Sequence, residues 1–249
     1  MSQKTAIITG GNKGIGLSIT EAFVKAGYAV VVGARTDTGI ETQFPGKVRY
    51  VSMDVRKEAG HRRLAEAALI WTGQVDVYVN NAGFSEWRPI ELIDETIFDN
   101  LIDTNLKGAF WGCKVAVGAM RNGGVIINIS SIAGKRGSSN NTMYCASKFG
   151  MNGLTQALAK EVGQRSIRVN AVCPVLVQTQ GLLQALESPH APAKGNVDSF
   201  MAKFITDNTA LGRLPVGEEV ADMCVFLASD QASAITAQCI NVDCGVFPQ

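Results

Sequence analysis

The sequence predicts a doubly wound α/β fold, in which one parallel sheet lies between two layers of helices. Short apolar runs alternate with amphipathic stretches of helical period along the whole chain, the pattern of repeated β–α–β units. The first unit contains a glycine-rich turn between a strand and a helix. No linker, internal repeat or low-complexity tract divides the 249 residues. We therefore predict a single domain covering residues 1–249.

The composition argues against several classes of protein. Hydrophobic residues make up 46% and charged residues 18% of the chain, which suits a globular domain with a large core. The formal net charge of +1 favours neither nucleic acid nor a membrane as partner. No apolar run approaches the ~20 residues of a membrane span, and the start of the chain does not resemble a signal peptide. The six cysteines form no CxxC pair, so we expect reduced thiols, no metal site and a cytoplasmic location.

Seven apolar runs are predicted as strands, and helical patterns separate most of them. The predicted strands are Thr5–Thr9, Tyr28–Gly33, Val48–Ser52, Val75–Val79, Val125–Ile129, Ile167–Val172 and Gln238–Val242. The principal predicted helices are Ile15–Ala26, Lys57–Trp71, a helical region that opens near Asp94 and continues through Asn105 toward Met120, Tyr144–Val162 and Gly217–Ala228. The connection from Arg35 to Lys47 is too short for a full crossover helix, so we expect a turn or a helical stub there.

The segment 175–215 is the irregular part of the chain. It contains two short helical patterns, Leu182–Glu187 and Asp198–Thr206, separated by proline and glycine. A connection of this length in a compact domain is typically a functional lid. We predict that it covers a substrate site, with an oligomer contact as the alternative.

The glycine-rich turn indicates a Rossmann-like, dinucleotide-binding site. Gly10 permits a tight turn after the first strand, and Gly14 permits the backbone to approach a pyrophosphate. Gly16 permits the following helix to pack closely on the strand. The spacing differs from GxGxxG, so the turn alone is a weak signal.

A second cluster of residues suits proton transfer to an oxygen atom. Tyr144 and Lys148 are four residues apart and share one face of a helix, where the ammonium is expected to lower the pKa of the phenol. Ser131 ends a buried strand, and parallel sheets bind ligands at the carboxyl ends of their strands. The alternative is an ordinary solvated Tyr–Lys pair.

Taken together, these motifs resemble those of the short-chain dehydrogenase/reductase family along essentially the whole chain. The matching stretches are the turn from Thr9 to Gly16, Asn80-Asn81-Ala82-Gly83, Ser131 with Tyr144 and Lys148, Asp54-Val55, Asn105, and Val169–Pro174. One departure is Val175, where the family usually has glycine after Pro174. Valine restricts the backbone and its approach to a ligand, which makes the roles of the residues after it less secure.

The resemblance implies an NAD(P)(H)-dependent oxidoreductase that interconverts a carbonyl and an alcohol. Tyr144 would be the general acid/base, Lys148 would hold the nicotinamide ribose, Ser131 would bind the substrate oxygen, and Asn105 would order a water. Asn80 is expected to bridge neighbouring strands. The resemblance also implies cofactor contacts from Gly10, Asn12, Lys13, Gly14, Ile15, Gly16, Arg35, Asp54, Val55, Asn81, Ala82, Gly83, Tyr144, Lys148, Pro174, Val177 and Thr179.

Two cations favour NADP(H) over NAD(H). A site for NAD would place Asp or Glu at the end of the second strand, whereas here that strand ends at Arg35. The Arg35 guanidinium can bind a 2′-phosphate, and Lys13 in the glycine turn can reach the same group. The alternative is that both are solvated surface charges.

The substrate is left open between sugars or polyols, ketones, 3-oxoacyl groups and steroids. Phe84, Trp87 and Met143 could form an apolar wall, and Asn141 and Gln178 could bind hydroxyls. Two other functions also stay open: a cofactor-binding sensor or scaffold without turnover, and an epimerase or dehydratase.

The resemblance further implies a homodimer or homotetramer. The predicted contact uses the helices around Leu101–Met120 and Ala146–Val162, where small residues would permit close packing between copies. The alternative is that these residues pack on the chain's own sheet. They are Gly108, Gly112, Cys113, Ala116, Gly150 and Gly153.

Overall fold

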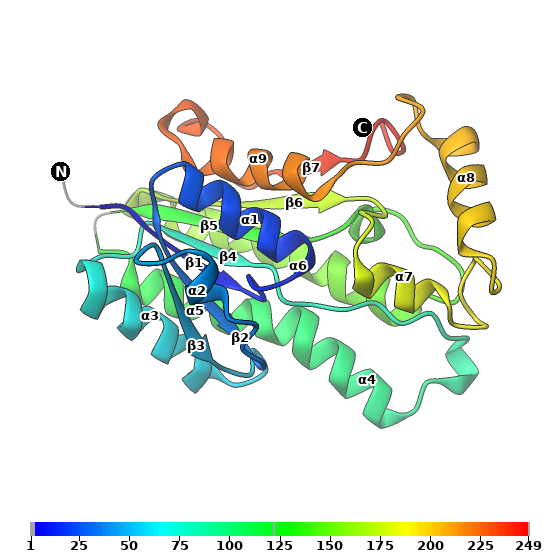
Figure 1. Cartoon of the computed structure of the whole chain (residues 1–249), viewed down its shortest axis with the longest axis horizontal. Coiled ribbons are helices and arrows are strands. Elements are labelled where there is room, and N and C mark those ends of the chain that lie inside the picture. The colour runs from blue at the N-terminus through cyan, green and yellow to red at the C-terminus, as the bar shows by residue number, and fades with distance from the viewer. Residues whose placement is uncertain (1–2, 122, 249) are drawn as a thin grey trace.

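In the computed structural model of the chain, seven parallel strands among the described residues form one sheet in the order β3–β2–β1–β4–β5–β6–β7 (Figure 1). The structure describes residues 3–121 and 123–248. All the strand pairs are parallel, as predicted. The strands are β1 (Thr5–Thr9), β2 (Ala29–Ala34), β3 (Val48–Ser52), β4 (Val77–Asn80), β5 (Gly124–Ile129), β6 (Ile167–Pro174) and β7 (Cys239–Val242).

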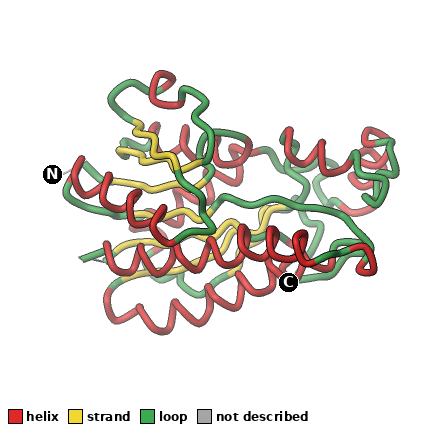
Figure 2. Tube along the Cα trace, turned by 90° about the horizontal axis from the view of Figure 1, so that it is seen from below, coloured by secondary structure: helices red, strands yellow, loops and turns green. Residues whose placement is uncertain are grey.

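Helices cover both faces of this sheet, which confirms the predicted three-layer α/β/α arrangement (Figures 1 and 2). Helices α1 (Gly14–Lys25) and α9 (Gly217–Ala228) pack side by side on one face. Helices α3 (Glu58–Thr72), α5 (Gly108–Ala119) and α6 (Thr142–Val162) cover the other. The connection after β2 contains only the four-residue α2 (Ile40–Gln43), so the prediction of a helical stub is confirmed.

The apolar strands divide their side chains between two cores because successive residues of a strand point to opposite faces. Ile8 belongs to the core under α1 and α9, whereas its neighbour Ile7 belongs to the core under α3, α5 and α6. Strands buried on both faces read as continuous apolar runs, which is why these strands could be recognised in the sequence.

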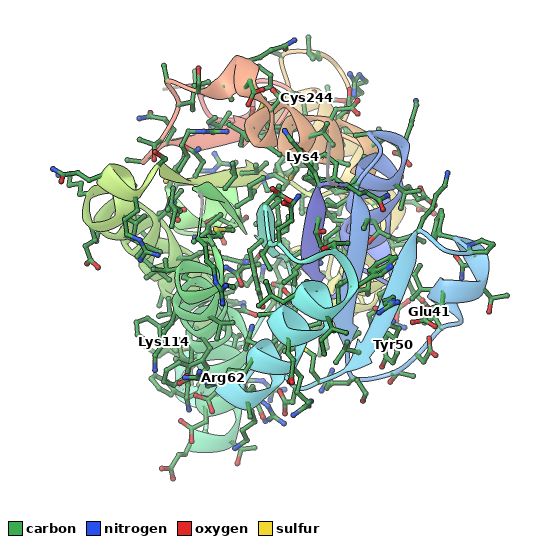
Figure 3. The ribbon with its side chains drawn as sticks, turned by 90° about the vertical axis from the view of Figure 1, so that its left-hand side faces the viewer. Lys4, Glu41, Tyr50, Arg62, Lys114 and Cys244 are labelled. Atoms are coloured by element: carbon green, nitrogen blue, oxygen red, sulfur yellow. The ribbon has the colours of Figure 1, made fainter. Side chains whose placement is uncertain are left out.

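Side-chain contacts tie α3 to α5 at the surface of the second layer. Glu58 near the start of α3 accepts from Lys114 of α5 at 2.8 Å and also pairs with Arg62 one turn along its own helix. Figure 3 shows Lys114 and Arg62 near each other at this junction. Exposed pairs of this kind add little to stability individually.

The predicted helical region from near Asp94 toward Met120 is confirmed, but it is not α-helical throughout. The chain forms α4 (Glu95–Ile102), then a π-helical turn, η2 (Asp103–Lys107), and then α5. A π-turn holds one residue more than an α-helical turn and rotates the side chains that follow it. The hydrophobic pattern does not reveal this inserted residue, which lies beside Asn105.

The small residues predicted to mediate contact between copies mostly pack within the chain itself. A Cβ on Gly112 would lie 1.9 Å from Asn80 Oδ1, and a Cβ on Gly108 would lie 3.2 Å from the Val55 side chain. Cys113 and Ala116 are buried in the core between the sheet and its helices. These close approaches explain why glycine occurs inside α5. On α6, a Cβ on Gly150 would lie 2.9 Å from the Leu106 side chain, whereas a Cβ on Gly153 would meet nothing within 4 Å among the described residues.

The segment 175–215 carries two helices, α7 (Gln180–Leu186) and α8 (Val197–Asn208), close to both predicted helical patterns. Figure 1 places them beyond the carboxyl ends of β6 and β7. Their buried side chains form a third apolar cluster with residues from other segments. That cluster contains Trp87, Ile132, Val175, Leu186, Ala191, Ala193, Met201, Leu214 and Val246.

Candidate active site

The glycine turn has the close packing that its spacing predicts. Gly10 and Gly14 have φ of +65° and +54°, values that side chains rarely tolerate. A Cβ on Gly16 would lie 2.0 Å from the Gly10 carbonyl oxygen. Only glycine therefore lets α1 start so close to β1.

The N-terminus of α1 is open to an anion. Its N-cap residue, Lys13, makes no side-chain capping bond within the described chain, and the first turn carries no acidic residue. The free backbone amides of such a helix end favour a phosphate. Opposite Gly14 lies Thr179, whose Cγ2 would be 3.3 Å from a Cβ at that glycine. A cavity of about 490 Å³ is lined by Gly14 and Thr179, together with Leu17, Ser18, Val177, Gln178, Ile205 and 214–218.

Thr9 and Asn81 join the glycine turn to the loop after β4. The Thr9 hydroxyl accepts from the backbone amides of Asn81 and Ala82 at 3.0 and 3.1 Å. Asn81 Nδ2 donates to the carbonyls of Thr9 and Gly10 at 2.9 and 3.2 Å. Sequence reasoning missed Thr9, although a hydroxyl residue at the end of a buried strand is a signal for such a tie.

Asn80, the residue before this loop, bridges β4 and β5 as predicted. Its Nδ2 donates to Asn128 Oδ1 at 2.8 Å. Asn128 in turn donates to the Thr155 hydroxyl of α6 at 2.8 Å. The chain of bonds fixes α6, and therefore Tyr144 and Lys148, relative to the sheet.

The loop after β3 places Asp54 and Val55 beside the same edge of the sheet. The Asp54 carboxylate is paired with Arg56, whose Nη2 lies 2.6 Å from Oδ2. Hydrogen bonds from Arg56 hold the pKa of Asp54 below its usual range, and the positive charges of Arg56 and Arg35 act in the same direction. Sequence reasoning missed Arg56, which follows the aspartate by only two residues.

Arg35 and Lys13, the two cations predicted to bind a 2′-phosphate, are both exposed. Neither forms an ion pair in the part of the chain that the structure describes. Between them, Asn12 Nδ2 donates to the Thr36 carbonyl at 2.8 Å, which joins the glycine turn to the segment after β2. Both charges are thus available to an anionic ligand.

Ser131, Tyr144 and Lys148 come together at the carboxyl end of β5. Lys148 is only 4% exposed, and its Nζ donates to the Ile129 carbonyl at 2.8 Å. The same Nζ lies 5.6 Å from the centre of the Tyr144 ring. Ser131 lies next to the Tyr144 phenol and acts to lower its pKa, and the Ser131 hydroxyl accepts from the Ala133 amide at 3.1 Å.

The expectation that Lys148 lowers the pKa of Tyr144 is wrong for this structure. Burial raises the pKa of the phenol to about 12, although the hydrogen bond with Ser131 opposes the change. Burial also lowers the pKa of Lys148 to about 8. Lys148 Nζ lies near the aromatic ring and bonds to the Ile129 carbonyl, and desolvation is the largest influence on the pKa of the phenol. Tyr144 is therefore protonated at neutral pH and can donate a proton.

Asn105, in the π-turn η2, is completely buried beside this group. Its Oδ1 accepts from the Phe84 amide at 3.0 Å, and its Nδ2 donates to the Phe84 carbonyl at 2.9 Å. A third bond runs from Nδ2 to the Ser147 hydroxyl at 3.2 Å. The side chain therefore joins the loop after β4 to α6.

Comparison with known proteins matches this architecture over almost the whole chain. The family model described as enoyl-(acyl carrier protein) reductase matches residues 10–247. The chain belongs to the short-chain dehydrogenase/reductase family. The predicted family and its activity, NAD(P)-dependent interconversion of a carbonyl and an alcohol, are thereby confirmed.

Individual relatives within this family catalyse related reactions. A 3-oxoacyl-[acyl-carrier-protein] reductase of Chlamydia muridarum is 34% identical, with 98% of this chain and 97% of the relative covered. A 4-formylbenzenesulfonate dehydrogenase of Comamonas testosteroni is 32% identical, with 98% of each covered. A crystal structure of an actinorhodin polyketide ketoreductase variant with NADPH superposes with a TM-score of 0.91 at 32% identity, covering 98% of this chain and 97% of that one. The NADPH in that structure agrees with the predicted NADP(H) cofactor.

Val175, the position at which this dehydrogenase/reductase departs from the family pattern, is buried in the structure. Val175 is 3% exposed and packs in the apolar cluster beneath α7 and α8. The positive φ of this segment falls on the next residue, Leu176, at +32°. Pro174 ends β6, and its carbonyl lies 3.5 Å from Ser131 Oγ.

The residues weighed for substrate contact differ in their surroundings. Trp87 is 7% exposed and belongs to the apolar cluster beneath α7 and α8, whereas Phe84 is 40% exposed. Asn141 is buried with its Nδ2 bonded to the Ser138 hydroxyl at 3.2 Å. Lys135 bonds to the carbonyl of Cys239 and to Asn241, so it acts as a tie to β7.

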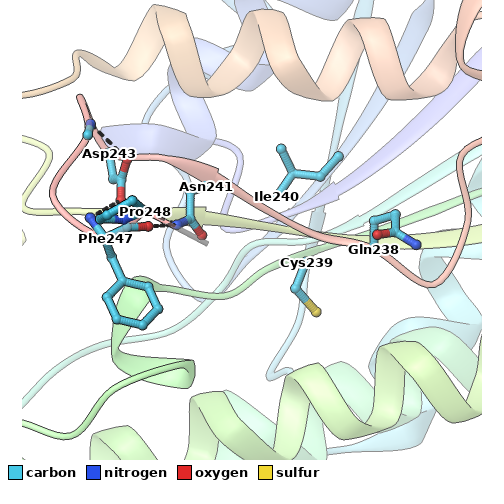
Figure 4. A pocket seen from close by; sticks show the side chains of 8 residues that line it. Gln238, Cys239, Ile240, Asn241, Asp243, Phe247 and Pro248 are labelled. Carbon is cyan, nitrogen blue, oxygen red and sulfur yellow. Dashed lines mark hydrogen bonds between the residues drawn. The ribbon is translucent and has the colours of Figure 1, made fainter.

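A second pocket lies at β7 and the C-terminal segment (Figure 4). It has a volume of about 410 Å³ and contains none of the predicted site residues. Its walls are Gln238, Cys239, Ile240, Asn241, Asp243, Gly245, Phe247 and Pro248. Among the described residues, no group of three His, Cys, Asp or Glu side chains could hold a metal ion, and no helix could span a membrane.

Proposed function

We propose that the chain is an NADPH-dependent reductase of a ketone or 3-oxoacyl group, with Tyr144 as its acid/base. The observation that carries this proposal is the grouping of Ser131, Tyr144 and the buried Lys148 at the carboxyl end of β5, with Lys148 Nζ 5.6 Å from the centre of the Tyr144 ring. A general acid must hold its proton at working pH and lie next to a group that can position the substrate oxygen.

Each residue has a separate task in this proposal. NADP(H) supplies or accepts the hydride at carbon. The Ser131 hydroxyl holds the substrate oxygen, and Tyr144 gives it a proton in reduction or takes one in oxidation. Lys148 binds the nicotinamide ribose, and Asn105 orders the water through which the proton returns from solvent. The bonds from Asn105 to Phe84 support a positioning role for its side chain.

The cofactor would extend from this group to the exposed cations at the other end of the site. The fit rests on the open N-terminus of α1, where a pyrophosphate would meet free backbone amides and Thr179. Arg35 and Lys13 would bind the 2′-phosphate, and Asp54 and Val55 would contact the adenine. The remaining contacts are those of Gly10, Asn12, Gly14, Ile15, Gly16, Asn81, Ala82, Gly83, Pro174 and Val177.

The segment 175–215 would act as the substrate lid. Its apolar cluster joins it to Trp87 and Ile132, so the lid contacts the loops that carry both Phe84 and Ser131. Relatives that reduce 3-oxoacyl groups make that class the first to test. The aldehyde named for the Comamonas relative is the second candidate.

We also propose a cytoplasmic homodimer or homotetramer. Three phenylalanines on α4, α5 and α6 support the contact, since Phe98, Phe110 and Phe149 are 46%, 46% and 47% exposed. Large exposed aromatic side chains on adjacent helices mark an interface more often than a free surface. Light scattering of the wild type and of Phe110→Asp tests this, because the charge should shift the wild-type oligomer toward monomer.

Turnover tests the proposed activity against the alternative of a sensor without catalysis. A 3-oxoacyl thioester, a cyclic ketone and an aryl aldehyde are each incubated with NADPH, and loss of the reduced nicotinamide absorbance is followed. We expect turnover of at least one carbonyl. Tight NADPH binding with no turnover of any of them would instead favour the sensor.

A further inference from the structure

A buried histidine–tyrosine pair lies behind the adenine end of the proposed cofactor site. His61 of α3 and Tyr78 of β4 are both 0% exposed. His61 Nδ1 lies 2.8 Å from the Tyr78 hydroxyl, and Nε2 lies 2.8 Å from the Val55 carbonyl oxygen. Both ring nitrogens are therefore bonded inside the protein.

Chemistry fixes the direction of these bonds. A carbonyl oxygen can only accept, so Nε2 carries the proton and donates it to Val55. In the neutral imidazole Nδ1 is then an acceptor, and the Tyr78 hydroxyl donates to it. Burial lowers the pKa of His61 and raises that of Tyr78, which keeps both groups neutral. The result is a directed chain from Tyr78 through His61 to Val55.

The far end of this chain is the loop that carries Asp54 and Val55. That loop is held at two further points: Arg56 donates to Asn100 Oδ1 of α4 at 3.1 Å, and the Val55 side chain packs against Gly108. Apolar side chains would fill the space of His61 and Tyr78 without the cost of burying polar groups. The polar pair therefore has a role beyond packing, because its hydrogen bond anchors the Val55 carbonyl.

We propose that His61 is a positioning residue that holds the Asp54–Val55 loop in the conformation that binds the adenine of the cofactor. The inference rests on the proposed cofactor site. His61 acts only through the Val55 peptide, and Tyr78 fixes the tautomer that makes His61 a donor to it. The pair should therefore set cofactor affinity and leave the proton-transfer residues unaffected.

Calorimetric binding of 2′,5′-ADP tests this directly, because that probe carries the adenine and the 2′-phosphate alone. We expect His61→Leu to weaken its binding about tenfold, the effect of losing one buried hydrogen bond that orders the loop. The KM for NADPH should rise by a similar factor while kcat at saturating NADPH stays at the wild-type value. Asn170→Ala is the matched control, since Asn170 is also buried and bonds only to Ile235 and Gln238 near β7.

The double variant His61→Leu/Tyr78→Phe separates positioning from stability. Removing both polar partners leaves no orphaned hydroxyl, so thermal stability should recover relative to His61→Leu. Binding of 2′,5′-ADP should stay weak, because the Val55 carbonyl still lacks its donor. Amide exchange of a peptide spanning 53–58 should be faster in both variants than in the wild type or Asn170→Ala.

Two failures have different meanings. If wild type does not bind 2′,5′-ADP, the proposed cofactor site itself is wrong. If wild type binds the probe and both His61 variants bind it equally well, the site stands and the positioning role of His61 is refuted. Recovery of affinity together with stability in the double variant would equally refute it, because the pair would then be a core element only.

Discussion

The two ends of the proposed cofactor site are built in opposite ways. At the catalytic end, Lys148 is almost fully buried, bonded to the Ile129 carbonyl and 5.6 Å from the centre of the Tyr144 ring, so the geometry exists before any ligand arrives. At the phosphate end, Arg35 and Lys13 are exposed and unpaired within the described chain. A preformed group of serine, tyrosine and lysine side chains suits proton transfer to a substrate oxygen, whereas exposed cations suit recognition of a charged ligand. Changes at the first end should therefore alter turnover, and changes at the second should alter cofactor choice.

The largest effect is expected at the catalytic end. Tyr144→Phe keeps the ring in place and removes the proton, so kcat should fall by ~10²–10⁴-fold, the usual contribution of a general acid. Initial rates with NADPH and the best carbonyl substrate measure it. Near-normal turnover in this variant would place the acid elsewhere.

At the phosphate end, Arg35→Asp should reverse the cofactor preference. We expect wild type to favour NADPH by at least ~10-fold in kcat/KM, since charge-assisted hydrogen bonds contribute ~1.5–3 kcal/mol each. The aspartate would repel the phosphate and accept a bond from the ribose hydroxyl of NADH. The preference of wild type should also shrink at high salt, because an exposed site is screened.

Arg121→Asp is the matched control for this reversal, since it removes an exposed cation that follows α5 and changes net charge equally. Its cofactor preference should equal that of wild type. A wild type that uses NADH as well as NADPH would show that Arg35 is an ordinary surface charge.

Much of the catalytic end and of the phosphate end of the proposed cofactor site could be predicted from the sequence. The glycine turn, the strands and the Tyr144–Lys148 spacing are local patterns, and their elements lie close to the predicted bounds. The partners of Asp54 and Asn105 were not predictable, because Arg56 is an ordinary charged residue in sequence and the bond to Phe84 depends on the π-turn. The pKa of Tyr144 also depends on burial, which the four-residue spacing does not report.

Packing in the segment 175–215 was also not predictable from the sequence. The two helical patterns of this segment are visible in the sequence. The sequence also shows Val175 as a departure from the family pattern, which we interpreted as affecting the cofactor site. The structure places Val175 in the apolar cluster beneath α7 and α8, with Trp87, Ile132 and Val246 from three parts of the chain outside this segment. Such long-range contacts leave no periodic signal near the residue itself.

Val175→Ala should therefore reduce stability and leave cofactor preference unchanged. Removing two buried methyl groups is expected to lower the free energy of unfolding by ~1–2 kcal/mol. Denaturant unfolding of this variant is compared with that of Val216→Ala, which changes a side chain that is 50% exposed and should cost almost nothing. Equal stability of the two variants would contradict the buried position of Val175.

The smallest effect is expected from the titration of Lys148. Its pKa is about 8 in the folded chain and near 10.5 in the unfolded one, so the unfolded chain binds more protons between these values. Its contribution to stability therefore rises with pH in this window, by ~1 kcal/mol between pH 8 and 9. The free energy of unfolding of Lys148→Met should lack this rise. Both proteins contain the same buried thiols, so the difference between their free energies of unfolding at each pH reports Lys148 alone. A pH-independent difference would show that Lys148 is not desolvated.

Cofactor binding to Tyr144→Phe tests most directly whether the catalytic end and the phosphate end of the site act independently. Calorimetry gives the dissociation constants of NADPH and NADH for this variant and for wild type. We expect the ratio of the NADH to the NADPH dissociation constant to be the same in the two proteins and to favour NADPH by at least ~10-fold. The reason is that changes at distant sites with no shared partner are independent. Loss of the preference in Tyr144→Phe would contradict this, and would show that the catalytic end takes part in recognising the cofactor.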